Sequence, residues 1–120
     1  MKIAVTSQGR EAESAVDPRF GRCKYFMVFD EATGKYTVLA NEQNLQSAQG
    51  AGIQAAQNLI DHGVEVVITG NIGPKAFKVL RANGIRIYIA SNLSVADAVA
   101  SYRAGRLPES LQENVEEHWV

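Results

Sequence analysis

Apolar residues occur in short runs along the chain, separated by polar or glycine-containing segments. The runs at 2–6 and 64–69 are rich in Ile, Val and Thr, which is typical of strands buried in a sheet. Residues 24–30 and 35–40 flank a Glu-Ala-Thr-Gly sequence, which predicts a β-hairpin whose glycine adopts a positive φ. A last run at 85–90 predicts a fifth strand.

Three segments carry helical spacing or helix-end residues. From Gly52 onward the apolar residues recur every three or four positions, and Gly63 stands where a C-cap belongs. Pro74 is favoured at the first position of a helix, and Ser94 is a suitable N-cap for another. The predicted helices cover 52–62, 74–82 and 95–102, the second ended by Asn83-Gly84 and the third closed by Gly105.

The order of these elements predicts the topology. A strand and a hairpin are followed by an alternation of helices and strands, which requires right-handed crossovers and a parallel central portion. The hairpin must then add an antiparallel strand. We therefore predict an α/β fold with a mixed five-stranded sheet in the order 3-2-1-4-5 and helices on its faces. The remaining long polar loops lie at 8–22 and 41–51, and a loop as long as the first is usually functional or mobile.

The C-terminal residues differ from the rest of the chain. Residues 107–120 are polar and acidic apart from four apolar residues spaced about four apart. This spacing predicts an amphipathic segment that packs on the body of the protein or on a partner. We therefore expect one cofactor-cluster-binding domain over 1–107 and an amphipathic tail over 108–120. The four apolar residues are Leu107, Leu111, Val115 and Trp119.

Composition narrows the function classes. The 120 residues suit one domain, and a formal net charge of -1 argues against nucleic acid as the main partner. No apolar run approaches the ~20 residues that span a bilayer, and the N-terminus lacks the apolar region of a signal peptide, so we expect a cytoplasmic protein without a membrane partner. A single cysteine excludes an intramolecular disulfide and a zinc site built from four Cys or from two Cys and two His.

Glycine-rich loops follow two predicted strand ends, where ligands of such sheets usually bind. Gly70-x-x-Gly73 before one helix and Gly50-Ala51-Gly52 before another place backbone N–H groups and positive helix-dipole ends at the same rim. Together they would stabilise an anion without a lysine. The alternative is that these glycines only make tight turns between strand and helix.

The segment from Asp17 to Cys23 is the most unusual in the chain. Arg19 and Arg22 flank an aromatic residue and a glycine, and arginine offers a planar fork of donors that suits oxyanions and polarisable sulfides. Alternatively, Arg19 pairs with Asp17 on the surface while Phe20 caps the core.

Cys23 itself allows two interpretations. It is either a metal ligand or thiolate favoured by Arg22 and Lys24, or a small buried hydrophobe at the start of a strand. For His62, capping of a helix end is favoured over ligation.

Catalytic constellations are scarce in the sequence. The first predicted strand holds no carboxylate, which argues against two-metal hydrolysis. No Ser-His-Asp or Cys-His pairing is evident, and no GxGxxG follows the first strand. We therefore expect a protein that is not an enzyme.

Several of these segments together resemble the dinitrogenase iron–molybdenum cofactor biosynthesis family, which includes NifX proteins, the C-terminal part of NifB and the orange protein. The resemblance extends over about residues 1–107 and implies a ribonuclease-H-like sheet. The matching pieces are Asp17-x-Arg19-Phe20-Gly21-Arg22-Cys23-x-Tyr25-Phe26, Gly50-Ala51-Gly52, Gly63-Val64, Val67-Ile68, Gly70-x-x-Gly73-Pro74-x-Ala76, Gly84-Ile85-x-Ile87-Tyr88 and Tyr102-x-x-Gly105-x-Leu107.

The resemblance further implies non-catalytic binding of an anionic metal–sulfur cluster, of the molybdenum–copper or iron–molybdenum sulfide type, or of a cofactor precursor. Nitrogenase-associated members often have a histidine in the turn equivalent to 19–23, whereas this chain has none there. The arginine-bearing form is similar to the orange-protein branch, in which the cluster is held without covalent protein ligands.

Three hypotheses follow. The first is a cluster carrier or scaffold that exchanges its cargo with donor and acceptor proteins, with Phe20 and Ile72 shielding the cluster from water. The second is an enzyme or binding module for a phosphorylated metabolite or nucleotide, cradled by the same loops. The third is a regulatory module that binds proteins through its tail. For the first, the candidate cofactor-binding residues are Ser7, Arg19, Phe20, Gly21, Arg22, Cys23, Gly50, Ala51, Gly52, Asn71, Ile72 and Gly73.

Overall fold

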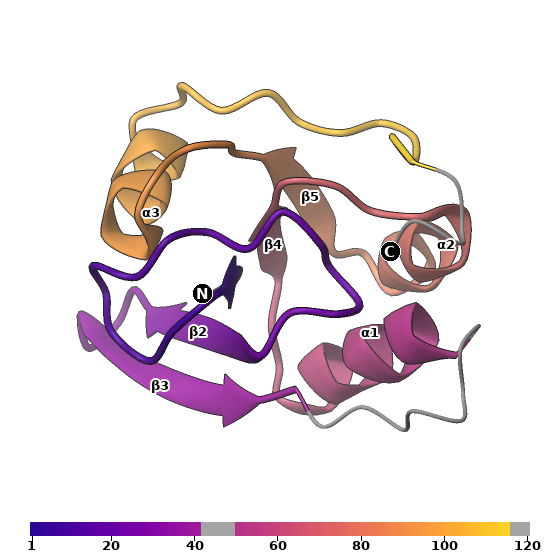
Figure 1. Ribbon diagram of the computed structural model, residues 1–120, viewed down its shortest axis with the longest axis horizontal. Helices are drawn as coiled ribbons and strands as arrows, with labels where there is room; N and C mark the ends of the chain where they lie inside the picture. The colour runs from indigo at the N-terminus through magenta and orange to yellow at the C-terminus, as the bar shows by residue number, and fades with distance from the viewer. Residues whose placement is uncertain (42–49, 116–120) are drawn as a thin grey trace.

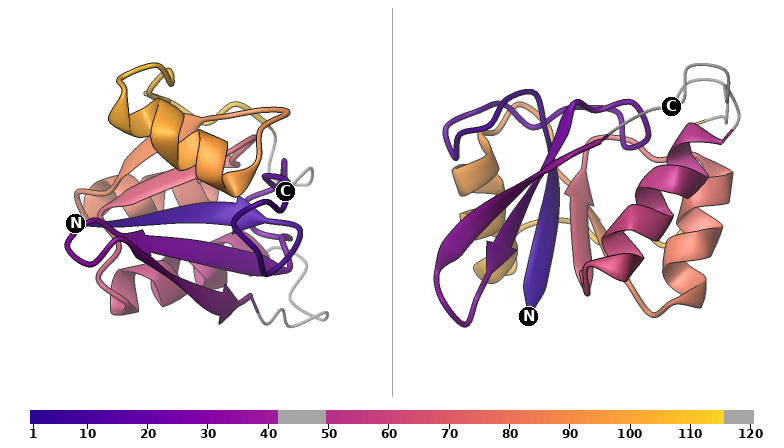
Figure 2. Two further views of the ribbon diagram at one scale, coloured as in Figure 1. Left: turned by 90° about the vertical axis from the view of Figure 1, so that its left-hand side faces the viewer. Right: turned by 90° about the horizontal axis from the view of Figure 1, so that it is seen from below.

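The structure, a computed structural model, describes residues 1–41 and 50–115. A central sheet carries α1 and α2 on one face and α3 on the other (Figures 1 and 2). None of the helices in the described part of the chain is long and apolar enough to cross a bilayer. The elements are β1 (Lys2–Ser7), β2 (Tyr25–Asp30), β3 (Lys35–Ala40), α1 (Ala51–Asp61), β4 (Val66–Thr69), α2 (Pro74–Ala82), β5 (Arg86–Ile89) and α3 (Val95–Arg103).

The strand order is β3-β2-β1-β4-β5, which confirms the predicted mixed sheet. β1 lies at its centre, antiparallel to β2 and parallel to β4. β5 continues the parallel half, and β3 closes the antiparallel half through the predicted hairpin. The carboxyl ends of β1, β4 and β5 therefore meet at one end of the sheet.

Side chains of each central strand alternate between two apolar cores. Ala4 of β1 faces the core beneath α1 and α2, together with Phe26 of β2. Its neighbours Ile3 and Val5 face the core beneath α3. This period of two lets every central strand bury both of its faces. The apolar runs are therefore almost continuous in the sequence.

The helix ends explain why two strands are shorter than predicted. The N–H of Val64 donates to Leu59 O (3.2 Å), and the N–H of Ile85 donates to Leu80 O (3.0 Å). In both places a glycine with φ near +74° precedes the donor and lets the chain reverse. Val64 and Ile85 therefore complete helix ends, and the strands begin after them.

The C-terminal segment runs beside β5 instead of forming a helix. The N–H of Ile89 donates to Pro108 O (3.0 Å), and the N–H of Ser110 donates to Ile87 O (2.8 Å). Leu107 packs against the α3-side core, whereas Leu111 is 73% exposed. Residues 107–115 contain no helix, so the four-residue spacing does not create one apolar face there. Trp119 lies outside the described residues.

Candidate functional site

Three loops meet at the carboxyl ends of the parallel strands, as their connectivity predicts. They are 8–24 after β1, 70–73 after β4 and 90–94 after β5. Backbone bonds tie the first loop to the third: the N–H of Val16 donates to Leu93 O (2.9 Å), and the N–H of Val95 donates to Ser14 O (2.8 Å). The loops divide this end of the molecule into two regions with different surfaces.

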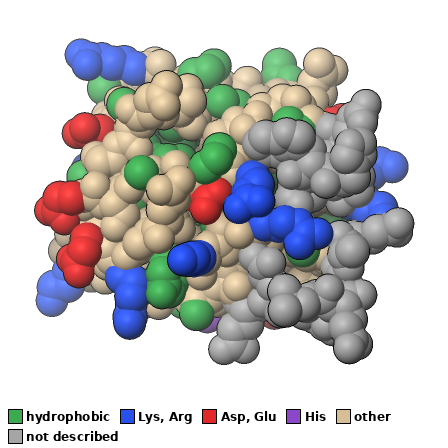
Figure 3. Space-filling view, in the orientation of Figure 1, with side chains coloured by type: hydrophobic (Ala, Val, Ile, Leu, Met, Phe, Trp, Pro, Cys, Tyr) green, Lys and Arg blue, Asp and Glu red, His purple; other side chains and the backbone are tan. Residues whose placement is uncertain are grey.

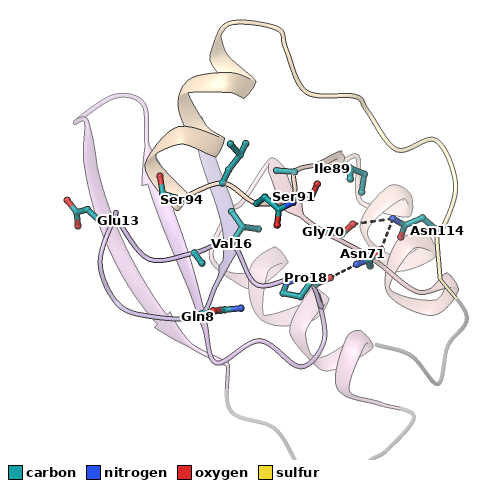
Figure 4. A pocket seen from close by; sticks show the side chains of 14 residues that line it. Gln8, Glu13, Val16, Pro18, Gly70, Asn71, Ile89, Ser91, Ser94 and Asn114 are labelled. Carbon is teal, nitrogen blue, oxygen red and sulfur yellow. Dashed lines mark hydrogen bonds between the residues drawn. The ribbon is translucent and has the colours of Figure 1, made fainter.

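The first region is an open pocket of about 840 Å³ on the α3 side, which we call the loop pocket. Figure 4 shows Gln8, Val16 and Pro18 of the first loop along one wall, Ser91 and Ser94 along another, and Asn71 with Asn114 at one end. Glu13 is the one charged residue among those that line it. The loop pocket is therefore polar but contributes no cationic side chain from the described residues.

The second region lies where α1 and α2 begin side by side. A Cβ built on Gly52, in the first turn of α1, would lie 3.2 Å from Ala76 Cβ, in the first turn of α2. A Cβ on Gly21 would lie 2.9 Å from the backbone N of Gly52, so the 19–23 turn packs directly on the start of α1. We call this arrangement, namely residues 19–23, 50–52 and 71–75, the helix-start site.

The helix-start site is rich in backbone donors. Among residues 1–41 and 50–115, no side chain caps the N-terminal residue of α1 or α2, Gly50 or Gly73, and neither helix has an acidic residue in its first turn. Uncapped N-termini present N–H groups and the positive end of the helix dipole. Two of them side by side suit one anion.

The two arginines of the turn occupy this region. Arg19 is exposed and Arg22 half-buried. The Asp17 carboxylate accepts the backbone N–H of Arg19 (2.9 Å), and no salt bridge to the Arg19 guanidinium is found among the described residues. Figure 3 shows several Lys and Arg side chains near the middle of the face, whereas most acidic side chains in view lie toward its left edge.

The turn is held in place by the 70–73 loop. The N–H of Phe20 donates to Asn71 O (3.2 Å), and Asn71 Nδ2 donates to Pro18 O (2.9 Å). A Cβ on Gly70 would lie 2.7 Å from Pro18 Cα, so only glycine fits this approach. These contacts place Arg19 beside the start of α2.

Two residues expected to shield a cluster lie within the core instead. Phe20 and Ile72 are fully buried beneath α1 and α2, and the Phe20 ring packs on Phe26 with centroids 5.5 Å apart. Phe20 thus anchors the turn in the core, which agrees with the alternative interpretation that Phe20 caps the core. Its backbone remains part of the helix-start site.

The Cys23 thiol is fully buried. Burial raises its pKa strongly, and the nearby Asp17 carboxylate raises it further. Its Sγ donates to Phe20 O (3.3 Å), while Asn41 Nδ2 donates to Cys23 O (2.9 Å) and Gly21 O (3.1 Å). This geometry corresponds to the interpretation of Cys23 as a small buried hydrophobe, and burial opposes the alternative interpretation as a thiolate.

The side chain of Ser7 is engaged within its own loop. Its Oγ donates to Gly9 O (2.7 Å) and accepts the Gly9 N–H (3.2 Å). Ser7 is fully buried at the end of β1, so it shapes the start of the long loop rather than a surface.

Sequence reasoning missed Asn41 and Asn114. Asn41 holds the carbonyls of the turn, and Asn114 Oδ1 accepts the N–H of Ile72 (2.7 Å), one of the donors assigned to the site. Neither residue belongs to a periodic pattern or motif. Both lie far from their partners in sequence, so no local signal points to them.

The described residues contain no group of three or more His, Cys, Asp or Glu side chains placed to hold a metal ion. What they offer is backbone N–H groups and guanidinium groups. This donor set fits an anion bound as a whole through hydrogen bonds and charge.

Known proteins share both the sequence and the fold of this chain. It has 30% identity over 112 residues to an uncharacterised protein of Methanocaldococcus jannaschii, covering 89% of each chain. The apo form of the orange protein from Desulfovibrio gigas superposes with a TM-score of 0.91 at 40% identity, covering 95% of this chain and 96% of that one. A Thermotoga protein described as NifB superposes with a TM-score of 0.79 at 30% identity, covering 96% and 97%.

The sequence profile of the family described as dinitrogenase iron–molybdenum cofactor matches residues 1–105. This match covers the whole helix-start site and every lining residue of the loop pocket except Asn114, and it confirms the resemblance drawn from the motifs. The chain therefore belongs to the dinitrogenase iron–molybdenum cofactor family.

Proposed function

We propose that this protein binds and carries an anionic metal–sulfur cluster, of the molybdenum–copper or iron–molybdenum sulfide type, or a precursor of such a cofactor, and that it does so without catalysis. The cargo binds at the helix-start site. The observation that carries the proposal is the meeting of two uncapped helix N-termini with an arginine-bearing turn.

The chemistry of these donors matches the cargo. Sulfide-rich clusters carry negative charge spread over polarisable sulfurs, which accept hydrogen bonds from N–H groups. The starts of α1 and α2 supply such N–H groups, while Arg19 and Arg22 supply charge and planar donors. These groups bind the sulfide atoms through hydrogen bonds and charge and do not ligate the metal. The cluster therefore stays intact and can be transferred whole.

Family membership supports the same cargo class. The matching family is named for the iron–molybdenum cofactor, and the orange protein was solved in an apo form, a term that implies a bound form. We propose that the partners are proteins that donate the cluster to this protein or accept it. A cytoplasmic location remains a prediction from the sequence. The division into a 1–107 binding domain and a 108–120 tail is likewise part of the proposal.

The proposal is tested by titrating the protein with tetrathiomolybdate and copper and following the charge-transfer absorbance. We expect a protein-dependent band that the double substitution Arg19→Ala/Arg22→Ala abolishes. Arg106→Ala is the matched control, because Arg106 is exposed and follows α3, away from the helix-start site. No protein-dependent band in the wild type, or an unchanged band in the double variant with a native circular dichroism spectrum, contradicts the proposal.

A phosphorylated metabolite or nucleotide is the second candidate, because helix N-termini bind phosphate as well as sulfide anions. The same titration separates the two ligand classes. Millimolar phosphate or ATP present during the titration leaves cluster uptake intact if the cluster is the true ligand. Nucleotide-dependent thermal stabilisation together with loss of cluster uptake favours the second candidate.

A further inference from the structure

Asn114 holds the 70–72 loop through four hydrogen bonds. Its Oδ1 accepts the N–H of Ile72 (2.7 Å), and its own backbone N–H donates to Ile72 O (3.1 Å). Its Nδ2 donates to Gly70 O (3.2 Å) and to Asn71 Oδ1 (3.3 Å). Figure 4 shows the side-chain bonds to Gly70 and Asn71 at the end of the loop pocket. One carboxamide thus engages both donors and acceptors of this loop.

The segment that carries Asn114 is anchored at two points. Residues 108–110 pair with β5, and the Glu109 carboxylate lies 3.9 Å from both Arg81 and Arg86. Asn114 is the second anchor. Between them the chain buries little apolar surface, since Leu111 is 73% exposed. We call residues 107–115 the C-terminal strap; it crosses from the edge of β5 to the approach to α2.

The loop is shaped without help from the strap. Asn71 already bonds to Pro18 O (2.9 Å), and the N–H of Phe20 bonds to Asn71 O (3.2 Å). Gly70 packs against Pro18, and Ile72 is buried in the core. Other contacts therefore fix the position of the Ile72 N–H, and Asn114 only provides that N–H with an acceptor.

We propose that the C-terminal strap competes with the cargo, Asn114 Oδ1 standing in for an acceptor atom of the ligand until a cluster displaces it. This inference rests on the proposed function. An amide oxygen is a weaker acceptor than an anion, so an incoming anion takes over the Ile72 N–H. Asn114 is exposed, and its carboxamide regains hydrogen bonds to water on leaving, so its release costs little. The strap thereby lowers the apparent affinity of the helix-start site for its cargo and favours release of the cargo.

The test compares cluster affinity in three full-length proteins, using tetrathiomolybdate and copper as the probe. Removing the side-chain anchor in Asn114→Ala raises the fraction of molecules whose Ile72 N–H is available. We expect binding to tighten by about three- to tenfold. Gln112→Ala is the matched control, an exposed amide in the same strap, and its affinity should equal that of the wild type.

Equal or weaker binding by Asn114→Ala than by the wild type overturns the strap as a competitor. A second measurement follows the strap directly: on cluster binding, the side-chain amide signals of Asn114 in the wild type should move to those of an Asn that is hydrogen-bonded only to water in NMR spectra. Binding with Asn114 still in place overturns the strap alone and leaves the proposed function standing. If neither the wild type nor Asn114→Ala takes up the probe, both proposals fail.

Discussion

The two regions at the carboxyl end of the sheet share Asn71 but differ in how they are built. The helix-start site is packed from below by Phe20 and Cys23, both fully buried, and by glycines that leave no room for a Cβ. The loop pocket is open and lined by Gln8, Ser91 and other neutral side chains, with Glu13 as the one charged residue among them. A donor array whose backbone is already held in place favours anion binding, because the turn and the helix starts need not rearrange when the ligand arrives; only the Asn114 side chain has to leave. An open pocket that no cationic side chain of the described residues lines lacks that advantage.

Removing the packing under the 19–23 turn should have the largest effect on the stability of the helix-start site. Phe20→Ala should lower the free energy of unfolding by about 3–5 kcal/mol, because a large buried ring is lost from a core that cannot refill. Ser91→Ala, in the exposed loop of the pocket, should change it by less than about 0.5 kcal/mol. Urea denaturation of both variants measures the difference. Similar small decreases in the free energy of unfolding for both variants would show that the helix-start site is no better packed than the loop pocket.

Adding one methyl group to the 19–23 turn should lower stability by less than Phe20→Ala does, while it acts directly on cluster binding. In Gly21→Ala the new Cβ meets Gly52 N at 2.9 Å and Gly52 Cα at 3.0 Å, so the turn and α1 must separate. We expect a loss of about 1–3 kcal/mol in stability and cluster binding weakened by about tenfold or more. Absorbance titration and urea denaturation measure the two effects.

Gly34→Ala is the matched control for that substitution. Gly34 has φ +71° in the hairpin, far from the site, and a Cβ there meets no atom within 4 Å. It should cost about 1–2 kcal/mol through backbone strain alone and leave cluster binding unchanged. Equal loss of binding in both variants would mean that stability, and not the geometry of the turn, governs uptake.

The last prediction concerns the pH dependence of stability. Burial raises the pKa of Cys23 in the folded protein, whereas the unfolded thiol ionises near about pH 8.5. Above that pH the unfolded chain releases a proton that the folded chain keeps, so stability present at lower pH is lost as pH rises, at up to about 1.4 kcal/mol per pH unit.

Comparing wild type with Cys23→Ala isolates this contribution, because Tyr36 and Tyr102, whose pKa values burial also raises, are common to both. The difference in unfolding free energy should shrink between about pH 8.5 and 10. Cluster binding by Cys23→Ala should match that of the wild type. Loss of the cluster in this variant would instead assign the thiolate as a ligand.

Much of the fold could be predicted because its signals are local or forced by topology. Pro74 and Ser94 mark helix starts, and Ser94 Oγ does accept the N–H of Asp97 (3.1 Å). The alternation of strands and helices allows few sheet orders once crossovers are right-handed. The strand order and the three helices followed from these constraints.

The sequence predicted which loops form the site, but not which of their side chains are buried and which are exposed. Residues 8–22 have no periodicity, so the sequence does not show that Phe20 and Cys23 point inward while Arg19 stays exposed. Contacts of Asn41 and Asn114 span 18 to 44 residues of sequence and arise from tertiary packing alone. The apolar spacing from Leu107 predicted an amphipathic segment packed on the body or on a partner, but it did not show that this segment pairs its backbone with β5 at Tyr88 and Glu109.

Cluster binding at the helix-start site is tested most directly by a map of backbone amide NMR shifts during titration with tetrathiomolybdate and copper. We expect the largest changes in the 19–23 turn and at Gly52 and Gly73, with small changes at 91–93 in the loop pocket. Large changes confined to 91–93, with the helix-start amides unmoved, would contradict cluster binding at the helix-start site.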